Sequence, residues 1–581
     1  MSLHLERRPY TVWQLLKAYW QSEQRASAYA FLSSVLVMSM FLVGMDVLFT
    51  DWYNVFYDAL QDYNWHSAYD LLVIFIFLAS IYIVLAVYRY YLQSFLGLRW
   101  RRWLTKEFLK RWLENRGYYY LEDFHDQTDN PDQRIQEDIN SLVTLSLSLL
   151  IGLLSSVVTI FAFIYILWKL SGILTIPLGH FGALHLPGYL VWVAIIYASI
   201  GTFFTFKIGR PLVMLNFEQQ RREANFRFAA IDLRSHAEHV ALYRGEEHQK
   251  NILQRIFSGV LENWYAIILR QKSLLWFTAG YNQISVILPL AVALPNYFNK
   301  VFKLGGLIQT LSAFGRIQEA LSFIVNSYTT IAEWQAVTKR LLTFLNHVDE
   351  AEQDAEKQNH FVYLTDANNV ITAKNLEIYL PDGELILKNI NQEFEHGKNY
   401  WIKGHSGIGK STFVRALAGI WPYGSGEIIM PRDQNIMFVP QRSYMPLGTL
   451  REALLFPDNV AAADEKELIQ LLHDCDLPNL AKQLYHVTMW SEHLSPGELQ
   501  RIAFVRVLLQ KPDWVFLDES TSALDLAHEQ QLYELLKTRL PNCSVISVGH
   551  RPSLQAYHDH QIDFTLYSTR AAKHFVPESP T

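Results

Sequence analysis

Four long stretches of the chain contain no Lys, Arg, Asp or Glu, and they limit its fold more than any other feature. They cover residues 71–88, 141–168, 188–206 and 273–298. A helix rises about 1.5 Å per residue, so the apolar stretch 28–49 would be about 33 Å long as a helix, enough for a hydrocarbon core of about 30 Å. We therefore predict an all-α membrane domain, residues 28–332, with six transmembrane helices at about 28–49, 69–92, 141–168, 188–206, 273–298 and 304–332.

Basic residues are distributed unevenly among the connections between these helices. Residues 51–68 and 171–187 contain no Lys or Arg, whereas residues 93–140 contain 8 and residues 207–272 contain 11. Because basic loops remain in the cytoplasm, the two basic connections are expected inside. An even number of spans then places both termini in the cytoplasm.

Residues 1–27 contain a short amphipathic segment that precedes the first span. Val12, Leu15, Leu16 and Tyr19 share one face of a helix. This pattern predicts a helix that lies in the membrane interface. An ordinary soluble helix is the alternative.

The rest of the composition excludes several classes of protein. A net charge of −6 gives no electrostatic case for binding nucleic acid. The two cysteines, Cys475 and Cys543, can form neither a disulfide framework nor a CxxC metal site. Residues 333–365 hold an acidic run at 349–356, which predicts a solvated linker.

After this linker, residues 404–412 fit the pattern G-x-x-x-x-G-K-[ST] of a phosphate-binding loop. Glycines let the backbone turn tightly, and N–H groups at the start of a helix bind phosphate oxygens. Lys410 is expected to reach the β- and γ-phosphates, and the Ser411 hydroxyl is expected to ligate Mg²⁺. The predicted loop comprises Gly404, His405, Ser406, Gly407, Ile408, Gly409, Lys410, Ser411 and Thr412.

Further candidates follow the loop, in a region where short β-branched or aromatic runs alternate with helical ones. This alternation predicts an α/β domain at residues 366–577. Asp518 and Glu519 end an apolar strand, so Asp518 is expected to act on Mg²⁺ and Glu519 to polarise the attacking water. Gln441 is placed to contact the metal, and His550 to contact the γ-phosphate.

In chain order, these residues resemble the motifs of ABC transporters. The loop resembles the Walker A motif, Gln441 the Q-loop, 494–501 the signature, Asp518-Glu519 the Walker B motif, 522–525 the D-loop and His550 the H-loop. The resemblance implies an ATPase domain in which two copies bind two ATP molecules between them. Ser495 and the Gly497 N–H would then meet the γ-phosphate held by the other subunit, and Asp525 joins the predicted ATP-binding residues.

The signature departs from the family pattern at one position. The usual motif has two glycines, and here the first is Pro496. Proline lacks an N–H donor but suits the first turn of a helix, so we expect the site to remain competent. Tyr379 resembles the aromatic residue that stacks on adenine, and a strand tyrosine packed on the core is the alternative.

The membrane half narrows the resemblance to the SbmA/BacA-like and peroxisomal ABCD transporters. Its motifs lie at 54–61, 128–135, 222–227 and 241–246. The resemblance implies an exporter-type fold of six helices fused to one ATPase domain, in other words a half-transporter that forms a homodimer. It is closest to bacterial members with a fused ATPase domain, which places it in the bacterial inner membrane.

Several functions remain open at this point. We expect ATP-driven transport of bulky hydrophilic solutes, peptide or cobalamin-like, by uptake into the cytosol. An acyl-CoA or another lipid-like amphiphile is the alternative substrate, and an ATP-using membrane sensor that moves nothing is the alternative class. The intact ATPase motifs disfavour a proton-driven carrier.

The sixth predicted span differs from the others because it is polar. A charge near the middle of a bilayer costs roughly 2.5–3.5 kcal/mol, so its charged residues should face protein or water. We expect a solute cavity lined by residues at helical spacing. The alternative is a buried Arg316–Glu319 pair that only holds helices together. The predicted cavity residues are Gln309, Ser312, Arg316, Glu319 and Asn326.

Overall fold

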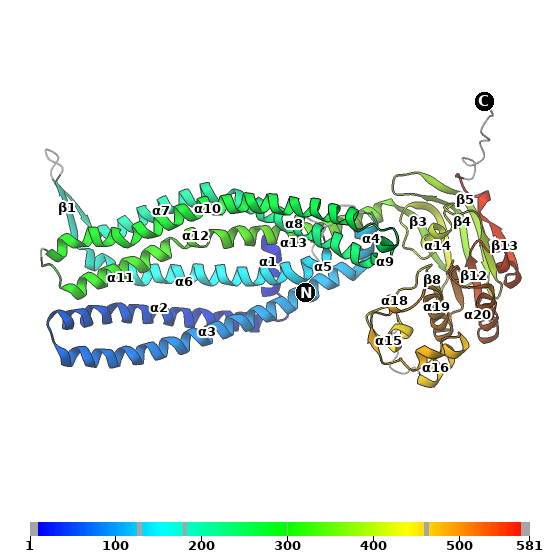
Figure 1. The fold of residues 1–581 in the computed structure, drawn as a ribbon, viewed down its shortest axis with the longest axis horizontal. Helices are drawn as coiled ribbons and strands as arrows, with labels where there is room; N and C mark the ends of the chain where they lie inside the picture. The colour runs from blue at the N-terminus through cyan, green and yellow to red at the C-terminus, as the bar shows by residue number, and fades with distance from the viewer. Residues whose placement is uncertain (1–9, 125–129, 178–182, 299, 458–463, 571–581) are drawn as a thin grey trace, which may run out of the picture. The chain divides into compact units, whose positions relative to one another are not determined.

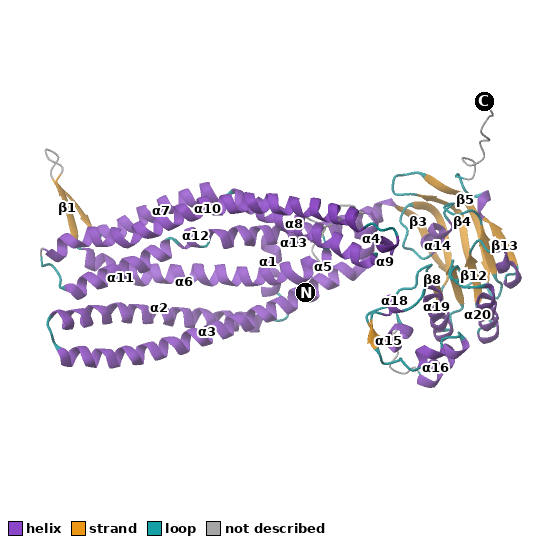
Figure 2. Ribbon diagram, viewed as in Figure 1, coloured by secondary structure: helices purple, strands orange, loops and turns teal. Residues whose placement is uncertain are grey.

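The computed structural model describes residues 10–124, 130–177, 183–298, 300–457 and 464–570. It divides into two compact units, Met1–Glu352 and Gln353–Thr581. Residues 1–9 of the predicted interfacial segment, 128–129 of one predicted motif and 571–577 of the predicted ATPase domain lie outside the described residues. The first unit is almost entirely helical, whereas the second mixes strands and helices (Figure 2).

Five helices in the described residues are long and apolar enough to cross a membrane. Long stretches of these helices are apolar on all sides, so their exposed faces are rich in Phe, Ile, Leu and Trp. They run side by side as a bundle (Figure 1). These helices are α2 (Arg25–Gln61), α3 (Trp65–Leu113), α6 (Ile139–Ser171), α7 (Tyr189–Gly209) and α10 (Glu246–Phe298).

The sixth predicted span is a broken helix at the centre of the bundle. It consists of α11 (Leu304–Leu321), α12 (Phe323–Asn326) and the start of α13 (Tyr328–Gln358). The α11 helix packs against α2, α6, α7 and α10. At the first break, the Ser322 hydroxyl lies 2.6 Å from the Tyr281 hydroxyl and accepts a hydrogen bond from Gln318 at 3.1 Å. These side-chain bonds accompany the interruption of the backbone ladder.

Residues 333–365 differ from the expected solvated linker. The helix α13 continues to Gln358, and the strand β3 (Asn359–Asp366) follows directly. The acidic run forms a helix since its charges have a partner. Arg111 of α3 donates to Asp349 at 2.9 Å and to Glu352 at 2.8 Å. Val348 and Ala351 are buried next to these charges, in the core that α13 shares with α3.

The amphipathic segment forms α1 (Val12–Trp20), capped by the Thr11 side chain. Leu15 and Tyr19 are buried, and the Tyr19 ring stacks on Trp100 of α3. Part of the predicted apolar face therefore packs against protein. Smaller elements complete this unit: α4 (Gly117–Phe124), α5 (Pro131–Gln133), a π-helical turn (Arg134–Asp138), the antiparallel hairpin β1 (Ile173–Pro177) and β2 (Ala183–Pro187), α8 (Pro211–Ser235) and α9 (Ala237–Leu242).

The second unit is built on a parallel sheet with the order β13-β6-β12-β11-β8. Its central strands, β11 (Trp514–Asp518) and β12 (Ser544–Val548), are buried along nearly their whole length. Both faces of such a sheet are covered, so β11 is apolar up to Asp518, and β12 buries Ser544 and Ser547 among its apolar residues. The other strands are β6 (Tyr400–Lys403), β8 (Ile436–Val439) and β13 (His560–Asp563).

A second sheet has the order β3-β7-β4-β5, with β4 (Val370–Tyr379), β5 (Leu385–Glu395) and β7 (Gly424–Pro431). The helices and the remaining short strands are α14 (Lys410–Leu417), β9 (Gly448–Thr449), α15 (Leu450–Leu455), α16 (Glu465–Asp474), α17 (Pro478–Ala481), β10 (Val487–Thr488), α18 (Trp490–His493), α19 (Pro496–Gln510) and α20 (Leu526–Arg539). The predicted fold class, helical membrane domain followed by α/β ATPase-type domain, is confirmed.

Candidate functional site

The predicted phosphate loop connects β6 to α14. Gly404, Gly407 and Gly409 have φ angles of +147°, +78° and +103°. This region favours glycine, and a Cβ on Gly404 would also lie 2.3 Å from the end of the Ile408 side chain. The loop therefore needs glycine at these positions for its own shape.

Lys410, the first residue of α14, is buried and bends back over this loop. Its ammonium donates to the carbonyl oxygens of Gly404 and His405, both at 2.8 Å. Burial lowers the pKa of Lys410, while the charges of Glu519 and Asp518 act in the opposite direction. The ammonium thus lies within the curl of the loop, where a bound anion would favour its charged form.

Ser411 and Asp518 meet beside the loop, because β11 ends next to the start of α14. The Ser411 hydroxyl donates to a carboxylate oxygen of Asp518 at 2.9 Å. Burial raises the pKa of Asp518, and the bond from Ser411 opposes this rise. The pair offers one hydroxyl and one carboxylate oxygen, which are the ligand types that Mg²⁺ prefers.

Glu519 joins the ends of three neighbouring strands. It accepts a hydrogen bond from Gln441, after β8, at 2.9 Å, and its other carboxylate oxygen lies 2.9 Å from His550, after β12. Its own backbone has a φ of +47°, and its N–H donates to Val548 at 3.0 Å. The structure therefore brings together three of the predicted catalytic and metal-contacting residues around one carboxylate.

The signature residues form the start of α19. Ser495 caps this helix: its hydroxyl accepts from the Glu498 N–H at 3.3 Å and donates to the Glu498 carboxylate at 2.7 Å. Pro496 occupies the first helical position. A proline there loses no helical hydrogen bond, because the first N–H groups have no partner within the helix.

Some predicted ATP-binding residues stand apart from the loop. In the part of the chain that the structure describes, no hydrogen bond or ion pair joins Ser495, Gly497 or Asp525 to residues 404–412. Asp525 caps α20 by accepting from the His528 N–H at 2.8 Å. The half-buried Tyr379 donates its hydroxyl hydrogen bond to Glu377 at 2.7 Å.

Two residues that sequence reasoning did not assign hold the D-loop in place. Gln500 of α19 accepts from the Ala523 N–H at 2.9 Å and donates to the Ser522 hydroxyl at 3.1 Å. Arg551 donates to the carbonyl oxygens of Leu524 at 2.6 Å and Ser522 at 2.8 Å. The only sequence signal for these roles is adjacency, since Gln500 lies within the signature run and Arg551 directly follows His550.

The predicted cavity residues of α11 divide into two groups. Gln309 is buried, donates to Asp51 at 2.8 Å and accepts from Asn54 at 2.9 Å. The Ser312 hydroxyl lies 3.3 Å from that of Thr50. Gln309 and Ser312 therefore attach α11 to α2, and Gln309 is not open to a solute as the predicted stripe required.

The charged residues of α11 have a different arrangement from the expected Arg316–Glu319 pair. Arg316 instead donates to Asp46 of α2 at 2.8 Å, and the Arg316 side chain is 40% exposed. Glu319 and Asn326 are exposed. Asn326 lines a cavity of about 420 Å³ together with polar residues of α10, namely Gln271, Thr278 and Asn282.

The motif at 54–61 has a structural role at the start of α11. Asp58 accepts from the Gly305 N–H at 2.8 Å, and Gln61 accepts from the Leu304 N–H at 2.7 Å. These bonds satisfy N–H groups that the first turn of a helix leaves free. A Cβ on Gly305 would lie 1.9 Å from the Asn54 carbonyl oxygen, so glycine permits this close contact.

Comparisons with known proteins agree with the geometry. Residues 15–298 match the family ABC transporter transmembrane region 2, and residues 387–522 match the family ABC transporter. The chain belongs to the ABC transporters, with a membrane region and an ATPase domain fused in one half-transporter. It therefore couples ATP hydrolysis to transport across a membrane.

Bacterial relatives cover almost the whole chain. An uncharacterized ABC transporter ATP-binding protein of Haemophilus influenzae is 36% identical over 91% of this chain and 88% of its own length. The inner membrane ABC transporter ATP-binding protein YddA of Escherichia coli is 34% identical over 93% of this chain and 94% of its own length.

Two more distant similarities concern function and fold. The human lysosomal cobalamin transporter ABCD4 is 26% identical over 80% of each chain. A bacterial Atm1-family ABC exporter with ATP bound has a TM-score of 0.75 at 18% identity, and covers 93% of this chain and 94% of its own. The chain thus has the fold of an exporter and is homologous to ABCD members.

Proposed function

We propose that the chain forms a homodimer in the bacterial inner membrane and uses Mg²⁺-ATP to take up a bulky hydrophilic solute, peptide or cobalamin-like, into the cytosol. In this proposal α1 (within residues 1–27) lies at the membrane interface and six helices cross the bilayer between residues 28 and 332. Residues 333–365 connect to the ATPase domain, 366–577, and both termini are cytoplasmic. The names of the E. coli and human relatives support the membrane and the solute class.

The proposed solute class is based on the polar, accessible face of α11. Arg316 is partly exposed and Glu319 is exposed, although both lie in a helix packed at the centre of an apolar bundle. A charge in such a place is expensive unless it is paired or faces water. Arg316 is paired with Asp46, whereas Glu319 has no ion-pair partner among the described residues. A path for an acyl chain would instead be lined by apolar side chains, so this face favours a hydrophilic solute.

The proposed catalytic roles follow from the site around Glu519. Glu519 polarises the attacking water, and Gln441 and His550 hold its carboxylate in place until the γ-phosphate engages them. Ser411 and Asp518 hold Mg²⁺, which supplies charge neutralisation when bound. The N–H groups of residues 404–412 bind the phosphates, and Tyr379 packs against the adenine.

The proposed dimer follows from the signature. Within the single chain, a Cβ on Gly497 would make only ordinary contacts, both at 3.5 Å, with Ala523 and Leu524. The fold of one chain therefore does not demand glycine at this position. In the proposal, close approach of the other subunit's ATP demands it, with Ser495 and Asp525 beside the same nucleotide.

Uptake by proteoliposomes tests the proposal. Liposomes that contain the purified chain would receive labelled cobalamin, a labelled Pro-rich peptide and a labelled acyl-CoA, each with ATP on one chosen side. Accumulation of cobalamin or peptide that is lost in Glu519→Gln supports the proposal. Movement of the acyl-CoA alone would overturn the solute class, and ATPase activity without movement of any probe would favour a sensor.

A further inference from the structure

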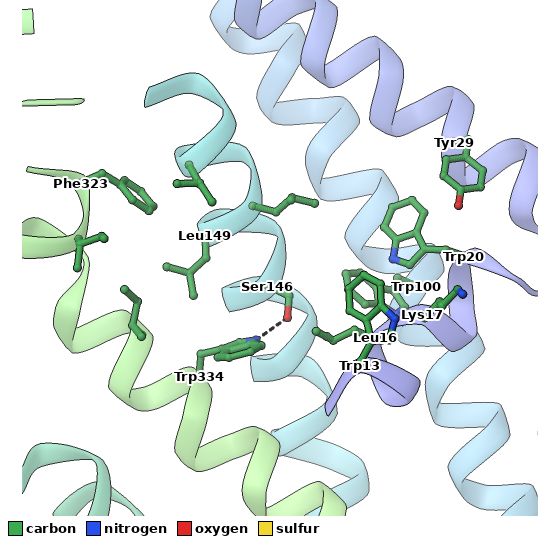
Figure 3. A pocket seen from close by; sticks show the side chains of 14 residues that line it. Trp13, Leu16, Lys17, Trp20, Tyr29, Trp100, Ser146, Leu149, Phe323 and Trp334 are labelled. Atoms are coloured by element: carbon green, nitrogen blue, oxygen red, sulfur yellow. Dashed lines mark hydrogen bonds between the residues drawn. The ribbon is translucent and has the colours of Figure 1, made fainter. Parts of the chain in front are cut away.

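A cavity of about 600 Å³ lies between the N-terminal helix α1 and the bundle. Its size falls in the range of small-molecule sites, roughly 300–1,000 Å³. Figure 3 shows that side chains from α1, α2, α3, α6, α12 and α13 converge on it. The residues that matter below are Lys17, Tyr29, Trp100, Ser146, Leu150 and Trp334.

Most of the lining is apolar, and the cavity is edged by aromatic residues. Trp13 is 70% exposed and Tyr29 is 52% exposed, although both line the cavity. Trp and Tyr concentrate where a membrane meets water, because each ring has an apolar body and a polar tip. The cavity therefore has the composition of a site at the depth where lipid headgroups meet acyl chains.

Lys17 supplies a positive charge at this cavity. Its side chain is exposed, and it makes no ion pair with any residue that the structure describes. A lysine near an anionic membrane surface contributes to binding through its charge. The combination of an apolar volume with one free cation indicates a ligand that has a hydrocarbon chain and an anionic head.

Trp100 and Trp334 belong to the apolar wall of the cavity. The Trp100 side chain is 3% exposed, and its indole nitrogen is buried. Trp334 donates its indole N–H to the Ser146 hydroxyl at 2.7 Å. Both rings therefore offer apolar surface to a ligand, and the charge of Lys17 selects its head.

We propose that this cavity binds an anionic glycerophospholipid of the surrounding bilayer. One acyl chain fills the apolar volume beside Leu150, and the phosphate lies by Lys17. Free phosphate would leave the apolar volume empty. Apolar side chains of a second copy would offer no negative charge to Lys17.

Native mass spectrometry of the full chain in detergent tests this site with two lipids that share the same acyl chains. The purified, delipidated protein would be titrated with phosphatidylglycerol and, separately, with phosphatidylcholine. The wild-type chain should bind phosphatidylglycerol more tightly. Lys17→Ala, a change of an exposed residue that should not disturb folding, should weaken phosphatidylglycerol about fivefold and leave phosphatidylcholine unchanged.

A further variant separates the acyl-chain contact from the charge. Leu150→Trp fills the cavity and should abolish the tight binding of both lipids. Lys169→Ala and Leu72→Trp are matched controls, because both residues are exposed in membrane helices and neither lines this cavity. Unchanged lipid binding in Leu150→Trp would overturn the proposal, and so would loss of dimer in that variant, which would assign the cavity to a second copy.

Discussion

The carboxylate of Glu519 is held on two sides, by Gln441 and by His550, each at 2.9 Å. Its backbone adopts a left-handed conformation, with a φ of +47°, which is uncommon outside glycine. Such conformations persist where the surrounding structure enforces them. Here the enforcing contact is the bond from the Glu519 N–H to Val548 at the end of β12.

Replacement of Glu519 by glutamine should separate ATP binding from hydrolysis. The amide keeps the size of the side chain but removes the base, so hydrolysis should fall by about 10²–10⁴-fold while ATP still binds. Phosphate release and nucleotide binding, measured on the same preparation, check this. Glu427→Gln, the same change at an exposed position on β7, is the control. Wild-type turnover in Glu519→Gln would show that another group orients the water.

A second prediction at this scale concerns pH and His528. This imidazole lies 2.8 Å from Asp525 and 3.1 Å from Asp476, and Arg501 contacts Asp476 at 3.4 Å. The hydrogen bond with Asp525 is the main cause that raises the pKa of His528 from 6.5, and the bond with Asp476 adds to it. The protonated form therefore stabilises the fold.

The sign of this effect follows from linkage. A raised pKa gives stability that is fully present below pH 6.5, the ordinary value, and is lost as the pH rises through the higher folded value. Thermal unfolding followed from mildly acidic to mildly alkaline pH should show this loss in the wild type. His528→Gln should flatten that part of the profile, and an unchanged profile would contradict the assignment.

At the scale of elements, the start of α19 shows what a sequence motif can and cannot predict. The motif predicted a competent signature with proline in place of glycine, and the structure adds that Pro496 stands at the first helical position, between the cap Ser495 and its partner Glu498. The competence of the site stays a prediction. A proline at this position lowers the entropy of the unfolded chain without loss of a helical bond.

Pro496→Gly should therefore keep ATPase activity nearly unchanged and lower stability by about 0.4–1 kcal/mol. Activity in detergent and thermal unfolding would be measured together. Pro496→Ala is the comparison, because it removes the proline ring without introducing the backbone freedom of glycine. An inactive but folded Pro496→Gly chain would show that the proline fixes a geometry that glycine cannot supply.

The tethers of the D-loop mark the limit of sequence reasoning at this scale. Walker, Q-loop and H-loop residues carry spacing and chemistry that a motif records. Gln500 and Arg551, however, act through backbone groups of Ser522, Ala523 and Leu524, which are more than twenty positions away. Backbone carbonyls and N–H groups exist at every residue, so only the folded chain shows which of them are used.

For the whole molecule, hydrophobicity predicted the membrane helices because lipid exposure requires apolar side chains on every free face. It could not predict the break at Ser322, which accompanies specific bonds to Tyr281 and Gln318. Hydrophobicity also could not show that the acidic run is part of the helix α13. That depends on ion pairs with Arg111 of α3, a helix far away in the sequence.

The effect of changing Gly497 on ATPase activity should depend on the contact between the two subunits of the dimer. Because a Cβ there meets only ordinary contacts within the chain, Gly497→Ala should fold with wild-type stability and yet lose ATPase activity in the dimer. Gly404→Ala is the contrast, since its φ of +147° and the 2.3 Å contact with Ile408 predict a loss of stability as well. Full ATPase activity in Gly497→Ala would count against the proposed placement of this residue at the other subunit's ATP.

The last prediction concerns how the charges of α11 are used. Arg316 pairs with Asp46 of α2 at 2.8 Å, so this pair holds two helices together. Removal of one partner leaves the other charge without compensation inside the bundle, which is strongly destabilising. Arg316→Ala should therefore lower the yield of folded protein, and Asp46→Asn, which keeps the shape of that partner, should show whether charge or contact matters.

Glu319 should behave differently because it is exposed and has no ion-pair partner among the described residues. Glu319→Ala should keep expression, folding and basal ATPase activity, and it should lose uptake of the solute if this face lines the cavity. Glu319→Gln then separates the roles: rescue of uptake assigns a hydrogen bond to the solute, and failure assigns the charge. Loss of folded protein with uptake per molecule unchanged would instead make Glu319 structural and remove the main support for a hydrophilic path along α11.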